Sequence, residues 1–190
     1  MRAKTPAQSA LVLLSGGIDS ATCAYLLKDR GFSVTGLFLD YGQAAHLAER
    51  SAAAAVSRSL DIPLKVATLN SESRFSGGEL TGRNAFFVFS AALVGRGRFD
   101  LIGLGVHAGT PYYDCTPEFA ALINSTLSGY TDGKTQLFTP FLAWSKRDIF
   151  DLFAKANIPI NYTHSCEFSD DPCAKCSSCL DREALNASQG

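Results

Sequence analysis

The chain has 190 residues, of which 46% are hydrophobic, and its formal net charge at pH 7 is −1. A chain of this length and composition can bury one good core with a small appendage, so we expect a single domain over residues 1–190. Its Lys and Arg residues are scattered and do not outnumber its acidic residues, which argues against a large nucleic-acid surface.

The amino-terminal stretch does not have the pattern of a targeting or membrane segment. It contains Arg2 and Lys4, but the apolar run that follows, residues 11–14, is only four residues long. Such a run is too short for the core of a secretory signal or for a membrane span, so we expect a cytoplasmic protein with no membrane partner. In that compartment the six cysteines are expected to remain thiols or thiolates rather than disulfides.

Short apolar runs alternate with longer helix-compatible stretches along most of the chain. The apolar runs predict strands at 11–14, 34–39, 64–69, 101–106 and 136–139. The stretches between and after them predict helices at 20–28, 46–60, 84–96, 119–127 and 145–156. This alternation indicates an α/β protein with a doubly wound, mostly parallel sheet, and we place its core at residues 10–160.

Turn and capping residues mark the ends of several of these elements. Gly31 is expected to end the first helix, and Ser145 with Asp148 is expected to cap the start of the fifth. Residues 71–82 and 108–117 show no clear periodicity and are predicted to be loops. Loops that follow the carboxyl ends of parallel strands are where a site is expected in such a fold.

The segment Ser15-Gly16-Gly17-Ile18-Asp19-Ser20 follows the first strand and leads into the first helix. Two glycines let the chain turn tightly and present successive N–H groups, and the helix adds its positive end, so we expect a phosphate to bind. The two serine hydroxyls can donate to it, whereas Asp19 suits a Mg²⁺ ion carried by that phosphate. The spacing is not that of a Walker loop, and an ordinary glycine-rich turn is the alternative. Asp40 and the segment after Val106 are expected to converge on the same edge of the sheet.

Four of the six cysteines gather in the last quarter of the chain. They are Cys166, Cys173, Cys176 and Cys179. Four thiolates at this spacing favour a structural zinc ion in a C-terminal zinc-binding segment, residues 161–190. An iron–sulfur cluster and uncoordinated buried thiols are the alternatives, and His164 is near enough in sequence to compete as a ligand.

The glycine-containing loop and the cysteines, with shorter motifs between them, are similar to those of one known family. The shorter motifs are Asp40-Tyr41-Gly42-Gln43, Gly82-Arg83-Asn84, Asp114-Cys115 before Pro117-Glu118-Phe119, Thr139-Pro140 before Ser145-Lys146, and Ser165-Cys166. In order and spacing they resemble the 7-cyano-7-deazaguanine synthase family of the ATP pyrophosphatase (PP-loop) superfamily. Taken singly, each has a structural interpretation, since Asn84 can cap its helix, Asp40 can end a strand and Pro117 can begin a helix.

The resemblance implies a three-layer fold of the adenine-nucleotide α-hydrolase type and a ligase that uses ATP, Mg²⁺ and Zn²⁺. It implies that the carboxylate of 7-carboxy-7-deazaguanine attacks the α-phosphorus of ATP, that ammonia displaces AMP to give an amide, and that a second adenylation gives the nitrile. It implies catalytic roles for Asp19, for Arg83 at the developing phosphate charge and for Asp114 at a purine-like N–H edge. The residues that it implies for nucleotide binding are Leu14, Ser15, Gly16, Gly17, Ile18, Asp19, Ser20, Ala21, Thr22, Asp40, Gln43 and Asn84.

The sequence departs from the family pattern near the expected substrate end. Ala44-Ala45 stand where the family usually has Arg-His, and Thr116 stands where it has Arg, although threonine cannot reproduce the bidentate guanidinium fork. One alternative is therefore a paralogue, related to synthase-like enzymes of antiviral defence, that adenylates a deazaguanine carboxylate and couples it to an amine on a protein partner. A non-catalytic zinc-ribbon binding module is the alternative from another class. The apolar helix at 84–95 could supply a homodimer interface or belong to the core.

Overall fold

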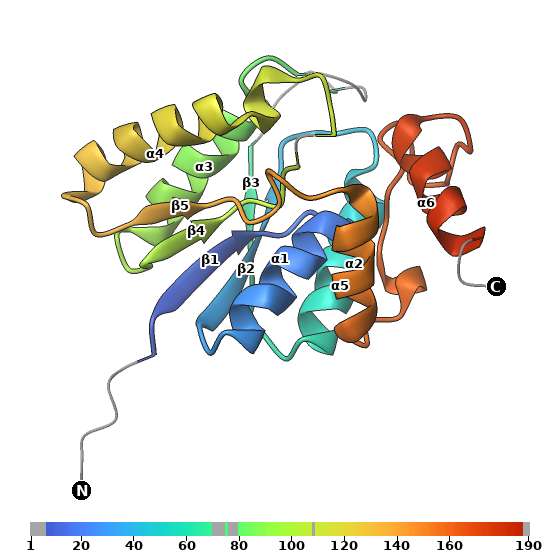
Figure 1. Cartoon of the computed structure of the whole chain (residues 1–190), viewed down its shortest axis with the longest axis horizontal. Coiled ribbons are helices and arrows are strands. Elements are labelled where there is room, and N and C mark those ends of the chain that lie inside the picture. The colour runs from blue at the N-terminus through green and yellow to red at the C-terminus, as the bar shows by residue number, and fades with distance from the viewer. Residues whose placement is uncertain (1–6, 70–74, 76–79, 108, 188–190) are drawn as a thin grey trace, which may run out of the picture.

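The computed structural model describes residues 7–69, 75, 80–107 and 109–187, and it shows one sheet between two layers of helices (Figure 1). The five strands pair in parallel in the order β3-β2-β1-β4-β5. They are β1 (Ser9–Leu13), β2 (Ser33–Asp40), β3 (Leu64–Thr68), β4 (Leu101–Gly103) and β5 (Gln136–Phe138). The predicted α/β class and each of the five predicted strands are confirmed, but β4 ends at Gly103 rather than at residue 106.

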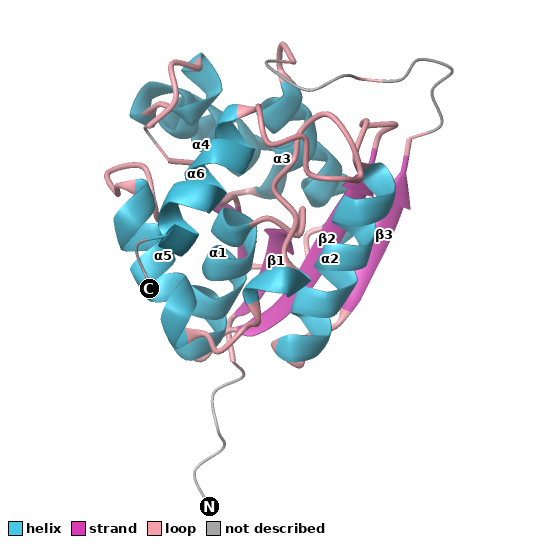
Figure 2. Ribbon diagram, turned by 90° about the vertical axis from the view of Figure 1, so that its right-hand side faces the viewer, coloured by secondary structure: helices cyan, strands magenta, loops and turns pink. Residues whose placement is uncertain are grey.

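The helices of the described residues lie on both faces of the sheet. They are α1 (Ile18–Asp29), α2 (His46–Ser59), α3 (Arg83–Gly95), α4 (Pro117–Thr131), α5 (Lys146–Lys155) and α6 (Ser177–Ala187), with 3₁₀ turns at Tyr113–Cys115 and Ile160–Tyr162. Helices α3 and α4 cover one face, and α1, α2 and α5 cover the other, which Figure 2 shows from the side. Helices α1 to α5 confirm the five predicted helices, α4 being longer than predicted at both ends, whereas α6 was not predicted. The predicted loop at 71–82 falls largely outside the described residues.

The strands divide their side chains between two hydrophobic cores. In β1, Ala10 and Val12 pack beneath α1, α2 and α5, whereas Leu11 and Leu13 pack beneath α3 and α4. Successive residues of a strand point to opposite faces, so a strand covered on both faces requires an uninterrupted apolar run. Full burial of each Leu or Val side chain contributes about 1.5–3 kcal/mol. The two cores therefore hold β1 at the centre of the sheet and fix the start of the loop that follows it.

Several helix ends are stabilised as the sequence predicts. Ser145 and Asp148 form a reciprocal capping box at the start of α5, in which each side chain accepts a backbone N–H of the other. Gly31, at φ +87°, follows the C-cap of α1. A side-chain cap such as that of Ser145 contributes about 1 kcal/mol to the stability of the helix. The capping role considered for Asn84 is wrong, because Gly82 is the N-cap of α3 and Asn84 lies buried inside the helix.

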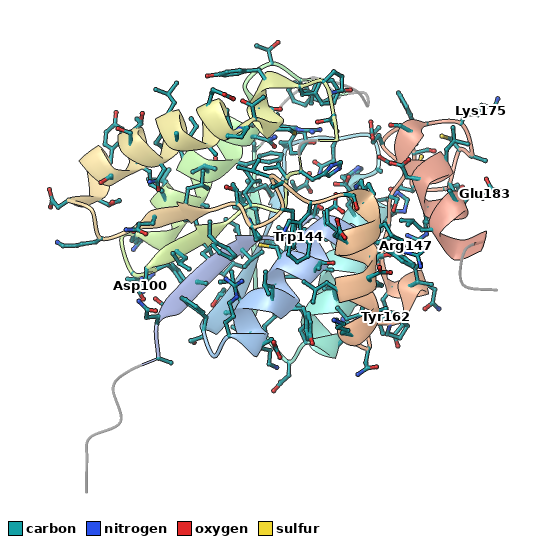
Figure 3. The ribbon with its side chains drawn as sticks, in the orientation of Figure 1. Asp100, Trp144, Arg147, Tyr162, Lys175 and Glu183 are labelled. Carbon is teal, nitrogen blue, oxygen red and sulfur yellow. The ribbon has the colours of Figure 1, made fainter. Side chains whose placement is uncertain are left out.

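The C-terminal segment, residues 160–187, lies beside α5 and α2 at one end of the molecule (Figure 1). Arg182 of α6 ties it together, because its guanidinium donates to the carbonyl oxygens of Thr163 at 2.9 Å and Ile160 at 2.6 Å. Lys175 and Glu183 lie on the outer side of this segment (Figure 3). None of the described helices combines the length and the apolar character that a membrane crossing requires.

Candidate functional site

A cavity of about 300 Å³ opens at the carboxyl edge of the sheet. It is lined by segments that follow β1, β2 and β4, and the C-terminal segment forms one wall. Strands β1 and β4 are neighbours, and the helices that follow them lie on opposite faces, which makes this the switch point where open α/β sheets bind ligands. Ser15 lines the cavity, as predicted. Val106 lines it as well, but the described residues of the predicted segment that follows Val106 do not, and Tyr41 rather than Asp40 lines it at the end of β2.

The glycine loop, residues 15–20, turns directly from β1 into α1. Gly16 has φ +87°, and a Cβ atom on it would lie 2.7 Å from Cβ of Ala52 and 2.8 Å from the carbonyl oxygen of Glu49. Only glycine fits, because such contacts are too short and positive φ disfavours other residues. Gly17 is the N-cap of α1, and no side chain of the described residues caps the helix there. The first N–H groups of α1 are therefore available for an anion in the cavity.

Hydroxyl groups lie on both sides of this loop. Oγ of Ser15 and Oγ of Ser20 are 3.1 Å apart, and both residues line the cavity. The Ser20 hydroxyl also donates to the carbonyl oxygen of Gly17 at 3.0 Å. These contacts hold the two side chains at the helix start, where they can add donors to those of the main chain.

Asp19 is paired with a lysine from a distant part of the chain. Nζ of Lys146 lies 2.6 Å from Oδ2 of Asp19, and Nε2 of His107 lies 3.9 Å from the same oxygen. Because the N–H of Gly109 donates to Nδ1 of His107 at 2.9 Å, the imidazole keeps its proton on Nε2, facing the carboxylate. Burial, and next the charge of Lys146, lower the pKa of His107, so the ring is neutral at pH 7.

Gly105, which follows β4, lets this strand end approach the start of α1. A Cβ atom on Gly105 would lie 2.7 Å from the carbonyl oxygen of Asp19 and 3.1 Å from the nitrogen of Ser20. Both are backbone atoms, which cannot rotate away as a flexible side chain can. This close contact therefore fixes the distance between the glycine loop and the end of β4.

A second polar group of the cavity surrounds Gln43. Its Nε2 donates to Oε2 of Glu49 at 2.8 Å and to the carbonyl oxygen of Leu39 at 3.1 Å, and its Oε1 accepts from the N–H of Tyr41 at 2.9 Å. Burial raises the pKa of Glu49 to about 7, although the bond from Gln43 and the charge of Arg83 oppose the rise. The carboxyl of Glu49 can therefore gain and lose a proton near neutral pH.

Arg83 and Asn84, the first residues of α3, also line the cavity. Arg83 contacts Tyr41, and within the described part of the chain its buried Nε atom has no hydrogen-bond partner. Nδ2 of Asn84 donates to the carbonyl oxygen of Asp114 at 3.3 Å. Asp114 itself is not among the described residues that line the cavity. The Nε–H group of this arginine could thus donate a hydrogen bond to a bound anion.

Most of the residues predicted for nucleotide binding lie on the cavity surface. They are Leu14, Ser15, Gly17, Ile18, Asp19, Ser20, Gln43 and Asn84. Gly16, Ala21, Thr22 and Asp40 are not among the described residues that line the cavity, and Ala21 and Thr22 are buried. The hydroxyl of Thr22 donates to the carbonyl oxygen of Ile18 at 2.7 Å, and Oδ1 of Asp40 accepts from the N–H of Gly42 at 3.3 Å.

Sequence reasoning did not single out Lys146, His107 or Glu49 as site residues. Lys146 belongs to the motif Ser145-Lys146, and this motif could have identified it as a site residue. His107 and Glu49 had no such signal, because their importance depends on contacts between segments far apart in the chain.

The four cysteines of the C-terminal segment come together as the sequence predicts. Their Sγ atoms all lie within 4.8 Å of one another, so the cluster could hold a metal ion. Burial alone would raise the pKa of Cys166, but hydrogen bonds from surrounding backbone N–H groups and from Ser169 outweigh it and lower that pKa to about 6. Nε2 of His164 lies 3.1 Å and 3.2 Å from two backbone carbonyl oxygens, so it donates a proton there and is not free to bind a metal.

The C-terminal segment is joined directly to the glycine loop. The N–H of His164 donates to the carbonyl oxygen of Gly16 at 3.0 Å. Oδ1 of Asp170 accepts from the N–H of Ala48 at 2.9 Å, in the first turn of α2. A metal held by the four cysteines would therefore stabilise both the wall of the cavity and the loop at its base.

The family model described as queuosine biosynthesis protein QueC matches residues 9–85 and 79–189 of the chain. A 7-cyano-7-deazaguanine synthase of Prochlorococcus marinus (strain NATL1A) is 33% identical over 207 residues, which cover 93% of this chain and 92% of that protein. A 7-cyano-7-deazaguanine synthase of Aquifex aeolicus (strain VF5) is 34% identical over 205 residues, which cover 91% and 94%. The family match includes both the glycine loop and the four cysteines.

Solved structures share the fold at much lower identity. A 4-thiouridine synthetase in complex with RNA and ATP gives a TM-score of 0.61 at 15% identity, covering 95% of this chain and 50% of that one. The NH3-dependent NAD synthetase of Campylobacter jejuni gives a TM-score of 0.54 at 19% identity, covering 84% and 68%. At these identities the likeness concerns the arrangement of strands and helices alone.

Proposed function

The chain belongs to the family of the queuosine biosynthesis protein QueC, and on that premise we propose that it is an ATP-dependent carbon–nitrogen ligase similar to 7-cyano-7-deazaguanine synthase. The proposed substrate is 7-carboxy-7-deazaguanine. Its carboxylate oxygen attacks the α-phosphorus of ATP, and the bond to pyrophosphate breaks. Ammonia then displaces AMP to give the amide, and a second adenylation dehydrates the amide to the nitrile.

The observation that carries the proposal is the glycine loop at the base of a switch-point cavity. Gly16 and Gly105 both lie in places where a Cβ atom would collide with backbone, so only glycine at these positions lets the loop pack this closely against α2 and the end of β4. The open start of α1 offers N–H groups and the positive end of the helix dipole to pyrophosphate. Such fixed dipoles stabilise the charge that develops on the leaving group without having to reorient during the reaction.

Lys146 and Asp19 are proposed to complete the phosphate site. The ammonium of Lys146 lines the cavity beside the glycine loop, and its pairing with Asp19 orients it before ATP arrives. There it can neutralise charge on pyrophosphate. The Asp19 carboxylate is a ligand type that Mg²⁺ prefers, and a magnesium ion, when bound, supplies further charge neutralisation.

Three residues are proposed to act nearer the reacting carboxylate and the purine-like ring of the substrate. Arg83 lines the cavity, and its buried Nε has no hydrogen-bond partner among the described residues, which suits the charge that develops at the α-phosphate. We assign Asp114 to the purine-like N–H edge of the substrate, with Asn84 holding its backbone through the bond at 3.3 Å. Adenylation by these residues is mainly a matter of position and charge.

We propose that the four cysteines bind zinc. A tetrahedron with Zn–S bonds of about 2.3 Å has sulfur–sulfur edges of about 3.8 Å, which is compatible with thiols all within 4.8 Å of one another. An iron–sulfur cluster places several iron atoms between its thiolates and needs a wider cage. Four protein ligands leave no open position for water, so this ion would hold the C-terminal segment against the glycine loop and take no part in the reaction.

The decisive experiment measures pyrophosphate release from ATP and Mg²⁺ with 7-carboxy-7-deazaguanine and ammonium, together with mass spectrometry of the product. Wild-type protein is expected to form pyrophosphate, AMP and the nitrile, and the Asp19→Ala variant is expected to form none of them. Absence of substrate-dependent pyrophosphate release from folded wild-type protein would contradict the proposal and would favour a passive zinc-containing binding module.

A second candidate is a paralogue that stops at an amide and uses an amine of a protein partner. It is favoured by the residues that replace the arginines and histidine of the family. Thr116 caps α4, where its hydroxyl accepts from the N–H of Phe119 at 3.2 Å, and Ala45 is a buried N-cap of α2. Neither offers a charge to a substrate. Amide without nitrile in the experiment above would select this candidate.

A homodimer is also proposed, with its interface on the outer face of α3 and α4. These helices pack side by side, and their outer face exposes 78% of Leu93, 58% of Leu122 and 41% of Phe86. Exposed apolar side chains of this size on neighbouring helices are typical of an interface. Sedimentation of the wild-type chain beside Leu93→Glu tests this, because the variant should sediment as a monomer and the wild type as a dimer.

A further inference from the structure

Glu49 is a carboxylate of the cavity that the proposed adenylation step does not use. It lies in the first turn of α2 and lines the same cavity as the glycine loop. Its backbone packs against that loop, because a Cβ atom on Gly16 would lie 2.8 Å from the Glu49 carbonyl oxygen. The backbone of Glu49 is therefore fixed against the glycine loop by the same contact that makes Gly16 necessary.

The Glu49 side chain is held in one orientation by Gln43. Both N–H groups of the Gln43 amide are used, one for Oε2 of Glu49 at 2.8 Å and one for the carbonyl oxygen of Leu39 at 3.1 Å. Its amide oxygen accepts from the N–H of Tyr41 at 2.9 Å. Since these bonds leave Gln43 no N–H for a nucleotide, its side chain serves to orient Glu49.

Charged groups from three other segments act on this carboxyl. Arg83, at the start of α3, favours its ionised form, whereas Asp40 at the end of β2 and Asp170 of the C-terminal segment disfavour it. Tyr41 lies in the same group and is itself affected by Glu49 and Arg83. Burial is the largest influence, and it raises the pKa of Glu49 to about 7. A group with that pKa can accept a proton at neutral pH and release it again.

The amine step requires such a group. When ammonia adds to an acyl adenylate, the new nitrogen carries a positive charge and must lose a proton before the amide is stable. Three other carboxylates of the described residues line the cavity. Asp19 is paired with Lys146, and Glu167 accepts a hydrogen bond of 2.5 Å from the hydroxyl of Ser178. Asp181 lies on α6, in the wall formed by the C-terminal segment, where its charge acts on His107. Glu49, held by a neutral amide, is better placed to accept the proton.

We propose that Glu49 is the general base of the amine step, an inference that rests on the function proposed above. The nitrogen lone pair of ammonia forms the bond to the acyl carbon, and the Glu49 carboxylate takes one proton from the resulting ammonium centre. The bond between the acyl carbon and the AMP oxygen then breaks, and its electron pair leaves with AMP. The products are the amide, AMP and one proton, which protonated Glu49 returns to solvent.

The test separates adenylation from amine transfer in the Glu49→Gln variant. Glutamine keeps the shape and an oxygen for the bond from Gln43, but it cannot take up the proton. Adenylation is measured as ATP–pyrophosphate exchange without ammonium, and amine transfer as amide formation from the preformed acyl adenylate. The matched control is Glu118→Gln, an exposed glutamate in the first turn of α4.

In Glu49→Gln, amide formation is expected to fall at least about 100-fold, while exchange falls far less. Hydroxamate formation from hydroxylamine should fall less than amide formation, because the nitrogen of the hydroxylamine adduct is more acidic and loses its proton to water more readily. At a constant concentration of free ammonia, the wild-type rate of amide formation should rise as pH increases through the pKa of Glu49, and the glutamine variant should lack that rise. Glu49→Asp, which keeps a carboxylate, should restore it, and Glu118→Gln should behave as wild type.

Equal loss of exchange and amide formation in folded Glu49→Gln, or loss of neither, would overturn the role of Glu49. A rise with pH that persists unchanged in the glutamine variant would overturn it as well. If wild-type protein shows neither exchange nor amide formation, the proposed function fails. If wild type turns over and Glu49→Gln matches it, only the role of Glu49 fails.

Discussion

The cavity has two halves, which differ in how the chain forms them. The pyrophosphate half consists of the glycine loop and the start of α1, which are consecutive residues that act mainly through main-chain N–H groups. The acceptor half consists of side chains, among them Glu49 and Arg83, that come from α2 and α3. A site made of backbone is altered mainly where a glycine is replaced, whereas a site made of side chains changes with each substitution.

This difference bears on where the chain departs from its family. Ala44, Ala45 and Thr116 replace polar or charged family residues at the substrate end, and the glycine loop keeps the family pattern. We therefore expect the pyrophosphate half to perform the common chemistry and the acceptor half to decide what is joined. Four changes test this difference between the two halves, and they are given in decreasing order of expected effect.

The largest effect is expected from Gly16→Ala. The new Cβ would lie 2.7 Å from atoms of α2 at φ +87°, so the loop must move, and a displacement of about 1 Å can cost about 100-fold in rate. Pyrophosphate exchange and thermal unfolding measure the result. Gly31→Ala is the matched control, because Gly31 has the same φ and no atom of the described residues lies within 4 Å of its Cβ position. This variant should lose about 1 kcal/mol of stability without loss of exchange. Similar exchange rates in the two variants would contradict the role of the loop.

Removal of the Lys146 charge is expected to come next. In Lys146→Met, Asp19 loses its partner at 2.6 Å and pyrophosphate loses a cation, so exchange should slow by about 10- to 100-fold. Lys155→Met, on the exposed last turn of the same helix, is the control and should exchange ATP as wild type does. Unchanged exchange in Lys146→Met would remove this lysine from the pyrophosphate half.

Metal removal should affect both halves more mildly, through the C-terminal segment. Chelation or Cys176→Ser would loosen the segment whose His164 N–H holds Gly16 and whose Asp170 holds the start of α2. We expect a lower unfolding temperature and a KM for ATP raised by about 10-fold, which corresponds to about 1.4 kcal/mol. Titration of metal content against both quantities checks this. Full activity and unchanged unfolding of metal-free protein would show that the cysteines do not support the cavity.

The smallest effect is a pH-dependent gain in stability in Glu49→Gln. The pKa of Glu49 rises from an ordinary value of 4.5 to about 7 on folding, so the folded protein binds the proton more tightly and loses stability as pH rises through this window. Glutamine stays neutral and escapes that loss. The variant should match wild type near pH 4 and become more stable above pH 7, by at most about 3 kcal/mol. Denaturant unfolding across a range of pH measures the difference in unfolding free energy between the two proteins. A difference that does not change with pH would show that burial does not raise the pKa of Glu49.

Local patterns made much of the fold predictable. The uninterrupted apolar run of β1 indicated a strand buried on both faces, and Ser145 with Asp148 marked the start of α5. Helix α6 was not predicted, and its place depends on contacts with residues outside it, such as those of Arg182 with Thr163 and Ile160. Its sequence is mostly polar.

The site was predictable to the extent that it is contiguous. The glycine loop and the four cysteines are short motifs whose geometry follows from their own spacing. The pair Lys146 and Asp19, by contrast, joins residues 127 positions apart, and the raised pKa of Glu49 depends on burial by segments that sequence alone does not bring together. Such contacts arise only when the sheet places the ends of β1, β2 and β4 side by side.

The central claim is that a substrate carboxylate attacks the α-phosphorus of ATP in this cavity, and an oxygen label tests it most directly. The enzyme would be given 7-carboxy-7-deazaguanine labelled with ¹⁸O in its carboxylate, together with ATP, Mg²⁺ and ammonium, and the AMP would be analysed by mass spectrometry. The account predicts AMP that carries one ¹⁸O atom, because the carboxylate oxygen that attacks phosphorus leaves with AMP. Unlabelled AMP, or ADP with phosphate in place of AMP with pyrophosphate, would contradict it.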